Sequence, residues 1–411
     1  MGFKSLAASC LLALLSFALA HVGADFAASE DARGQNWVAT WGASPESTPL
    51  LPANTPNPTF TNQTVRMIAH TSIGGNQIRV RFSNAFGSDT LLIGAAHIAL
   101  SDGGSKIKEG SDRALTFSGN TLISIPPGAV VVSDAVKLDV PQMSDLDVSV
   151  YFPLSTGEAT WHLAAHQTNY VSRQGDFTAT ADMPLDHTAT SWFFLSDIEV
   201  AAPKQSLAVV TLGDSITDGT NSTLDANHRW PNFLAARLLA SHLSLSVVDQ
   251  GIGGNRILHD IVGQNALARL DRDVLTQAGI GYVTVLLGIN DIGYSVRNQP
   301  TQPVTDLEII AGLSQIIARA HERGLKIFGC TLTPFEGATY FTDEGEGKRQ
   351  SVNNFIRTGG VYDGVIDFDA AVRDPNHPSR LLPADDSGDH LHPNDAGYQA
   401  MANAINLSLF K

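Results

Sequence analysis

Apolar and polar residues alternate along the first half of the chain. The segments 78–83 (IRVRFS) and 146–152 (LDVSVYF) place every second side chain on one face, as strands with one buried face do. Turn residues such as Gly74-Gly75 and Pro126-Pro127-Gly128 separate these segments, and no helical period is apparent between them. The pattern predicts an all-β sandwich or jelly-roll domain over residues 37–200.

Beyond Pro203 the pattern changes to short apolar runs separated by stretches with a helical period. The predicted strands are residues 207–212, 245–248, 282–287, 325–330 and 365–368. The predicted helices include residues 230–242 and 306–323, and Gly324 has the position of a C-terminal cap. Because strands alternate with helices, we expect an α/β domain over residues 205–411, with a parallel five-stranded sheet flanked by helices in three layers.

The first twenty residues differ from the rest of the chain. Lys4 precedes an apolar stretch over residues 6–19, and Ala18-Leu19-Ala20 ends it with small residues. This order is typical of a secretory signal peptide. A membrane anchor is the alternative, but the run is short for a bilayer span and lacks a basic flank on its far side. We therefore predict a signal peptide at residues 1–20, an N-terminal segment at 21–36, and a secreted, extracellular protein without an integral membrane span in the mature chain.

Length and charge narrow the class of protein. The chain has 411 residues, of which 43% are hydrophobic and 16% charged, which suits two domains with cores of their own. Its formal net charge is −15. Binding to nucleic acid requires clustered Lys and Arg, so we expect no nucleic acid as a partner.

Cysteines and glycosylation motifs fit the exported route. Cys10 leaves with the predicted signal peptide, so the mature chain holds Cys330 alone and forms no intramolecular disulfide. Cys330 ends an apolar run and is predicted to lie in the core. Three N-x-S/T motifs make Asn62, Asn221 and Asn406 glycosylation candidates, although Asn406 falls in a predicted helix.

Four motifs follow strands or precede the last helix of the predicted α/β domain. They are GDSIT at 213–217, GIGGN at 251–255, GIND at 288–291 and DHLHPN at 389–394. Each has a structural alternative: Ser and Asp cap helices, Asn forms turns, and Asp-x-x-His makes loop hydrogen bonds or half of a metal site. In parallel sheets, ligands bind at the carboxyl ends of the strands. Because the four motifs are expected to meet at these strand ends, we predict that they form one site.

The four motifs resemble blocks I, II, III and V of the SGNH hydrolases, also called GDSL esterases, across residues 205–411. The resemblance implies that Ser215 is the nucleophile, His392 the base and Asp389 the acid. It also implies that the oxyanion donors are Ser215, Gly254 and Asn290, and it gives His390 and Asp291 no such role. No cofactor is implied.

The first half resembles the amino-terminal β-domain of a secreted branch of that family. The segments WVATWGASPE, TVRMIAHTSIGGNQIRVRFSNAFG and IPPGAVVVSDAV carry this resemblance. Members of the branch are described as arylesterases, lipases or acylhydrolases. The resemblance implies ester hydrolysis and leaves the substrate open.

The residue types support this chemistry independently. A serine hydroxyl becomes nucleophilic when a neighbouring base takes its proton, and His392 can do so while Asp389 holds the ring. Backbone amides and the Asn290 side chain can stabilise the oxyanion. Thr217 stands where the G-x-S-x-G elbow of α/β-hydrolases has its second glycine, which argues against a lipase of that type.

Three alternatives stay open: a lipase or phospholipase acting on longer acyl chains, a non-catalytic carbohydrate-binding protein, and a metal-dependent hydrolase. The second would use Trp37, Trp41, Trp161 and Trp192 as stacking faces, although such residues are more often core. The third would use Asp389, His390 and His392 as metal ligands.

The segment 217–230 is polar, which favours a small acyl group such as acetyl on a polysaccharide. Trp230 either lines the acyl pocket or anchors its helix. We expect a monomer acting on a small-molecule ester or an acylated polysaccharide, with no metal.

Overall fold

The computed structural model describes residues 34–47, 58–297 and 302–411. Gln35–Lys411 forms one compact unit. The predicted signal peptide at 1–20 and most of the predicted segment 21–36 lie outside the described residues. The division of the rest into domains at 37–200 and 205–411 stays a prediction.

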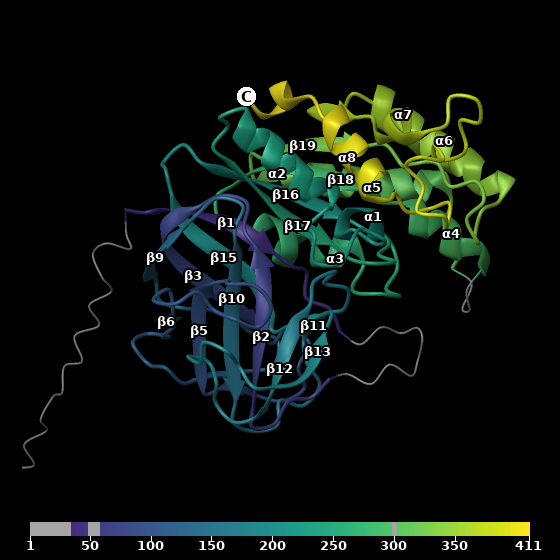
Figure 1. Cartoon of the computed structure of the whole chain (residues 1–411). Coiled ribbons are helices and arrows are strands. Elements are labelled where there is room, and N and C mark those ends of the chain that lie inside the picture. Colours follow the sequence, from purple (N-terminus) through teal and green to yellow (C-terminus); the bar gives the residue numbers. More distant parts are fainter. Residues whose placement is uncertain (1–33, 48–57, 298–301) are drawn as a thin grey trace, which may run out of the picture. The chain divides into compact units, whose positions relative to one another are not determined.

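The first part of the described chain consists of antiparallel strands, as the alternating pattern predicts (Figure 1). These strands are β1 (Asn36–Gly42), β2 (Gln63–His70), β3 (Gly75–Ser83), β4 (Leu91–Ile93), β5 (Ala95–Leu100), β6 (Arg113–Ala114), β7 (Ile123–Ile125), β8 (Val130–Val132), β9 (Val136–Val140), β10 (Asp145–Phe152), β11 (Trp161–His162), β12 (Asn169–Gln174), β13 (Leu185–Ala189), β14 (Trp192–Phe193) and β15 (Leu195–Ala202). One sheet has the order β1-β15-β3-β8 with β9 also paired to β3, and a six-stranded sheet has the order β13-β12-β2-β10-β5-β6.

The side chains that the alternation assigns to the buried face are buried. Ile78, Val80 and Phe82 of β3 are fully buried, while Arg79 and Arg81 between them are partly exposed. Arg79 and Arg81 both pair with Glu199 of the neighbouring strand β15, so the charged side chains of β3 find a partner within its own sheet.

The second part alternates strands and helices, as predicted. Its elements are β16 (Leu207–Gly213), α1 (Ser215–Asp218), α2 (Trp230–Ala240), β17 (Leu245–Gly251), α3 (Ala266–Leu270), the π-helix η2 (Asp271–Leu275), β18 (Ile280–Leu286), α4 (Ile289–Arg297), α5 (Asp306–Glu322), β19 (Lys326–Cys330), α6 (Asp343–Thr358), β20 (Gly364–Ile366), α7 (Phe368–Val372), α8 (Asp395–Ala404) and the 3₁₀ helix η3 (Leu407–Phe410). The five strands form one parallel sheet with the order β17-β16-β18-β19-β20.

The helices form two groups around this sheet. Helix α2 packs against α8, which in turn packs against α7, whereas α5 packs against both α3 and α6. One predicted strand is too long: β20 ends at Ile366 and Phe368 begins α7, because the Asp367 side chain accepts a hydrogen bond from Ala370 N and caps that helix. None of the helices in the described part of the chain is long and apolar enough to cross a bilayer.

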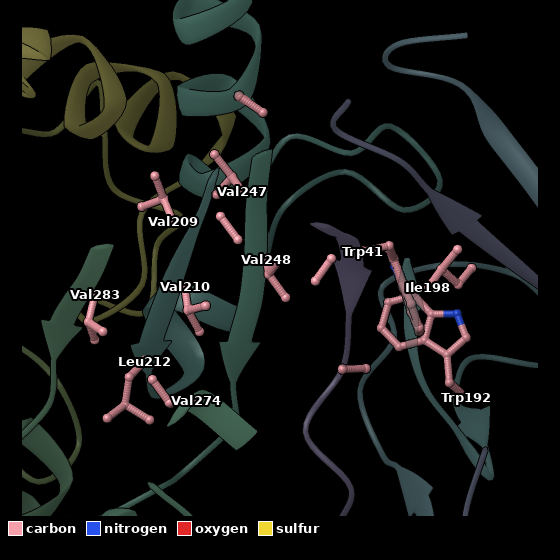
Figure 2. Close-up of a cluster of buried hydrophobic side chains, with 14 of the residues drawn as sticks. Trp41, Trp192, Ile198, Val209, Val210, Leu212, Val247, Val248, Val274 and Val283 are labelled. Carbon is pink, nitrogen blue, oxygen red and sulfur yellow. The ribbon is translucent and has the colours of Figure 1, made fainter. Parts of the chain in front are cut away.

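One hydrophobic core runs from the antiparallel strands into the parallel sheet. Figure 2 shows Trp41, Trp192 and Ile198 beside Val248 and its neighbours in the parallel strands. Strand β1 lies against β17 at the edge of the parallel sheet, and Ala39 N of β1 donates to the Ala278 carbonyl before β18 (2.9 Å). The two parts therefore stabilise each other directly.

Most of the tryptophan side chains, and the cysteine Cys330, lie in the core. Trp41, Trp161 and Trp192 are each at most 7% exposed, and only Trp37 is partly exposed, with the Arg79 guanidinium 4.4 Å from its ring centre. Trp230 is completely buried and packs against Phe368, so it anchors α2 rather than lining an acyl pocket. Cys330 is buried at the end of β19 with a free thiol, as expected.

Candidate active site

Ser215 stands at the carboxyl end of β16, where it is the first residue of α1. Asp214, not Ser215, caps this helix, because the Asp214 carboxylate accepts from Ile216 N (3.0 Å). The turn is tight: a Cβ atom at Gly213 would lie 2.0 Å from Thr217 Oγ1. Ser215 does not adopt a positive φ. The capping alternative for Ser215 is therefore wrong, and its hydroxyl is left for chemistry.

The Ser215 hydroxyl, the His392 ring and the Asp389 carboxylate form one continuous hydrogen-bonded chain. Ser215 Oγ lies 2.8 Å from His392 Nε2, and His392 Nδ1 lies 2.6 Å from Asp389 Oδ2. The serine and the histidine are separated by 177 positions in sequence, and the loop before α8 brings them together. Such an arrangement can supply a nucleophile, a base and an acid that orients the base.

Asp389 is held in its charged form. Partial burial alone would favour the protonated acid. Hydrogen bonds from the His392 ring and from the backbone N–H groups of His392 and Leu391 outweigh that effect, so they lower the pKa of Asp389 below its ordinary value. A carboxylate therefore faces His392 Nδ1 across the neutral pH range. It fixes the ring tautomer that leaves Nε2 free to accept the serine proton.

The two further predicted oxyanion donors follow β17 and β18, the strands that flank β16 on its two sides. Gly254 follows β17 and has a φ of +75°, a conformation that suits glycine. Asn290 is the second residue of α4, the helix that follows β18, and is buried. Its Nδ2 donates to the Asn255 carbonyl (3.1 Å), and Tyr340 OH lies 3.4 Å from its Oδ1. These contacts orient the Asn290 amide and occupy one of its two N–H bonds.

Asp291, which the resemblance leaves without a role, ties these two turns together. Its carboxylate accepts from Ile257 N (2.8 Å) and Leu258 N (3.2 Å), just beyond the GIGGN motif. Burial raises the pKa of Asp291 to about 6, against the opposing effect of those hydrogen bonds. The residue after Asn290 thus fixes the segment that carries Gly254, and the GIND motif gave no sign of this contact.

A buried arginine that the sequence did not single out braces the strand ends. Arg269 in α3 is fully buried, and it donates to the carbonyls of Gly213 (2.9 Å) and Gln250 (2.8 Å), to Asn255 Oδ1 (3.0 Å) and to Ser44 Oγ (2.8 Å). It therefore holds β16, β17 and the glycine turn in register around Ser215. Apart from Asp273, which lies 3.3 Å from Arg269 Nη1, its partners belong to other segments, so the local sequence does not mark this role.

The proposed metal ligands do not converge. His390 Nδ1 pairs with Asp386 Oδ2 (2.6 Å), while His392 and Asp389 belong to the hydrogen-bonded chain on Ser215. Among residues 34–47, 58–297 and 302–411, no group of three or more His, Cys, Asp or Glu is placed to hold a metal ion.

The three glycosylation candidates differ in their surroundings. Asn62 Oδ1 accepts from Tyr151 OH (2.8 Å). Asn406 is not in a helix as predicted: α8 ends at Ala404, and the Asn406 side chain caps η3. Asn221 Nδ2 donates to Asp389 Oδ2 (2.9 Å). This candidate therefore lies beside the hydrogen-bonded triad of Ser215, His392 and Asp389.

Part of the chain is similar to known proteins. Residues 211–400 match the model of the GDSL-like Lipase/Acylhydrolase family. No curated protein matches the chain. Among solved structures, an acetyl xylan esterase, AlAXEase, is 20% identical (48% of this chain, 97% of that chain, TM-score 0.38). A catalytic mutant of an acetylxylan esterase from Geobacillus stearothermophilus is 23% identical (49% and 93%, TM-score 0.39). A GDSL-like lipase from Bacteroides thetaiotaomicron VPI-5482 is 17% identical (49% and 87%, TM-score 0.38).

The structural likenesses cover about half of this chain and their TM-scores are low, so they carry no argument about function. The family match includes the end of the strand that leads to Ser215, the GIGGN and GIND motifs, and the loop with Asp389 and His392. Residues 211–400 form a GDSL-like lipase/acylhydrolase domain, and the chain is a carboxylic ester hydrolase.

Proposed function

We propose that this protein is a secreted serine esterase that works through an acyl-enzyme on Ser215 and removes short acyl groups, such as acetyl, from a small ester or an acylated carbohydrate. The observation that carries the proposal is the unbroken chain Ser215–His392–Asp389, with contacts of 2.8 and 2.6 Å. Export is inferred from the first twenty residues. We expect the enzyme to act as a monomer without a cofactor.

The triad accounts for both halves of the reaction. Ser215 Oγ attacks the ester carbonyl carbon as its proton passes to His392 Nε2, and the imidazolium then protonates the departing alcohol. Water attacks the resulting Ser215 ester, gives a proton to His392 Nε2 and releases the acid, and that proton returns to Ser215 Oγ. Asp389 stabilises the imidazolium in each half.

Negative charge on the carbonyl oxygen requires donors that are already in place. We assign this role to the backbone N–H groups of Ser215 and Gly254 and to the second N–H of Asn290. The contact of Asn290 Nδ2 with the Asn255 carbonyl supports the assignment, because it fixes the amide plane before substrate arrives. Removal of one such donor typically costs about 3 to 4 kcal/mol in the barrier.

The segment after α1 supports a small, polar substrate. Its side chains are engaged in polar contacts with the surrounding chain: Thr223 and His228 both bind the Asp395 carboxylate, and Asp225 accepts from Thr168 Oγ1. A lid for long acyl chains would instead offer a continuous apolar face. We therefore favour short acyl groups over the longer chains of a lipase or phospholipase.

A carbohydrate-binding role without catalysis is less well supported, because three of the four candidate tryptophans are buried in the core. The test is a series of p-nitrophenyl esters of rising chain length. We expect kcat/KM to be highest for acetate and to fall steadily with length. A maximum at long chains would contradict the substrate assignment, and absence of activity on every ester would contradict the esterase itself.

A further inference from the structure

Asp389 receives hydrogen bonds on both of its carboxylate oxygens. Oδ1 accepts from the N–H groups of Leu391 (3.0 Å) and His392 (2.8 Å) and from the Ser387 hydroxyl (3.3 Å). Oδ2, the oxygen that faces the ring, accepts from His392 Nδ1 (2.6 Å) and from Asn221 Nδ2 (2.9 Å). Asn221 therefore shares with His392 the oxygen on which the triad depends.

The Asn221 amide also binds the loop that carries the acid. Its Nδ2 donates to Ser387 Oγ (2.9 Å), and the Ser387 backbone N–H donates to the His392 carbonyl (3.1 Å). Both N–H bonds of the amide thus point into the loop of Asp389 and His392. The amide bridges the segment after the nucleophile helix to the segment of the acid and base.

Residues of helix α8 hold Asn221 in its position. Asn221 has a φ of +66°, a left-handed conformation in which asparagine is enriched. On its amino side, Tyr398 OH donates to the Thr220 carbonyl (2.6 Å), and on its carboxyl side Thr223 N donates to Asp395 Oδ1 (2.8 Å). The loop that carries Asp389 and His392 leads directly into α8. The positions of Asn221 and Asp389 are therefore both fixed by this helix.

The antiparallel part of the chain holds the same segment from the other side. Asp225 N donates to the His166 carbonyl (3.2 Å), and the Asp225 carboxylate accepts from Gln167 Nε2 (2.8 Å) and Thr168 Oγ1 (2.7 Å). The segment that carries Asn221 is therefore fixed at several points along its length.

We propose that Asn221 is a positioning residue of the triad: its amide keeps Asp389 Oδ2 directed at His392 Nδ1 while the imidazolium forms. The Asp389 side chain is 42% exposed, and the Asn221 amide is the contact that shares Oδ2 with the His392 ring, so its loss weakens the alignment of that oxygen. The inference rests on the proposed function of Ser215 as nucleophile.

The test is Asn221→Gly, because glycine tolerates the positive φ and lacks the amide. We expect kcat on p-nitrophenyl acetate to fall about tenfold, which corresponds to one charge-assisted hydrogen bond lost from the transition state. KM and Tm should stay unchanged. Asn221→Asp keeps the shape but places a second carboxylate against Asp389, so kcat should fall further than in the glycine variant.

Asn227→Gly is the matched control, because Asn227 lies in the same segment with a φ of +54° and should keep wild-type kcat. Wild-type kcat in Asn221→Gly, or an equal loss of kcat and Tm in both glycine variants, would overturn the inference. Activity in Ser215→Ala would overturn the proposed function instead, so the two failures are distinguishable.

Discussion

The ring of His162 in β11 lies 3.0 Å from the carboxylate of Asp218, the last residue of the helix that begins with Ser215. The other ring nitrogen, Nδ1, lies 2.9 Å from the Ser44 carbonyl, which can only accept. Both ring nitrogens therefore face acceptors, and both side chains are buried. The contact joins the antiparallel part of the chain to the nucleophile helix through a charged pair.

This pair makes the stability of the protein depend on pH. Burial alone would lower the pKa of His162, but the charge and hydrogen bond of Asp218, followed by the charge of Glu46, raise it from 6.5 to about 9. A histidine with a raised pKa stabilises the folded state fully below its unfolded pKa and loses that contribution as pH rises through the folded pKa. The free energy of unfolding should therefore fall between about pH 6.5 and 9, by roughly 3 kcal/mol.

Denaturant unfolding checks this expectation when it is measured for the wild type and for His162→Gln from about pH 6 to about pH 9.5. The wild type should lose stability with rising pH, whereas the variant should be less stable at pH 6 and show a flatter slope. Equal slopes in the two proteins would contradict a charged His162.

A second prediction concerns the Asn290 side chain. Asn290→Ala should lower kcat by about a hundredfold or more with little change in KM, because the amide acts on charge that develops in the transition state. Tyr340→Phe is the matched control: it removes the hydroxyl 3.4 Å from Asn290 Oδ1 and should retain most of kcat. If Asn290→Ala instead lowered Tm while kcat per folded molecule stayed normal, the residue would serve the turn and not the reaction.

A third prediction concerns glycosylation of Asn221. Glycosylation of Asn221 would replace one of the two Nδ2 hydrogens, both of which the structure uses on Ser387 and Asp389. In protein secreted from a eukaryotic host, we expect Asn221 to be unmodified in the active fraction. Peptide mass spectrometry of that fraction measures occupancy, and full activity with a glycan on Asn221 would contradict the expectation.

Sequence patterns predicted the strands and the placement of the motifs well, for a physical reason. The alternation in β3 reflects a strand with one buried face, and the apolar run of β16 reflects a strand that is buried on both faces. The errors lie at the ends of elements: Asn406 falls outside α8, and the apolar run at 365–368 continues past β20, because Phe368 is buried in a helix capped by Asp367. A short apolar run cannot tell a strand from the start of a buried helix.

The contacts that support the triad could not be predicted in this way. Arg269, Asp291 and His162 act through partners that lie far away in sequence or belong to other segments. The pattern of apolar and polar residues does not identify a buried arginine, because an arginine in a helix normally reads as an exposed polar position. The sequence marks Asn221 as a glycosylation candidate and gives no sign of its contact with Asp389, because the two residues are 168 positions apart.

If the acyl group passes through Ser215, the mass of the enzyme will show it when turnover of p-nitrophenyl acetate is stopped by acid. We expect one acetyl group on the peptide that contains Ser215, no acetyl group and no activity above background in Ser215→Ala, and the same Tm in both proteins. A label on another residue, or full turnover by Ser215→Ala, would contradict the account.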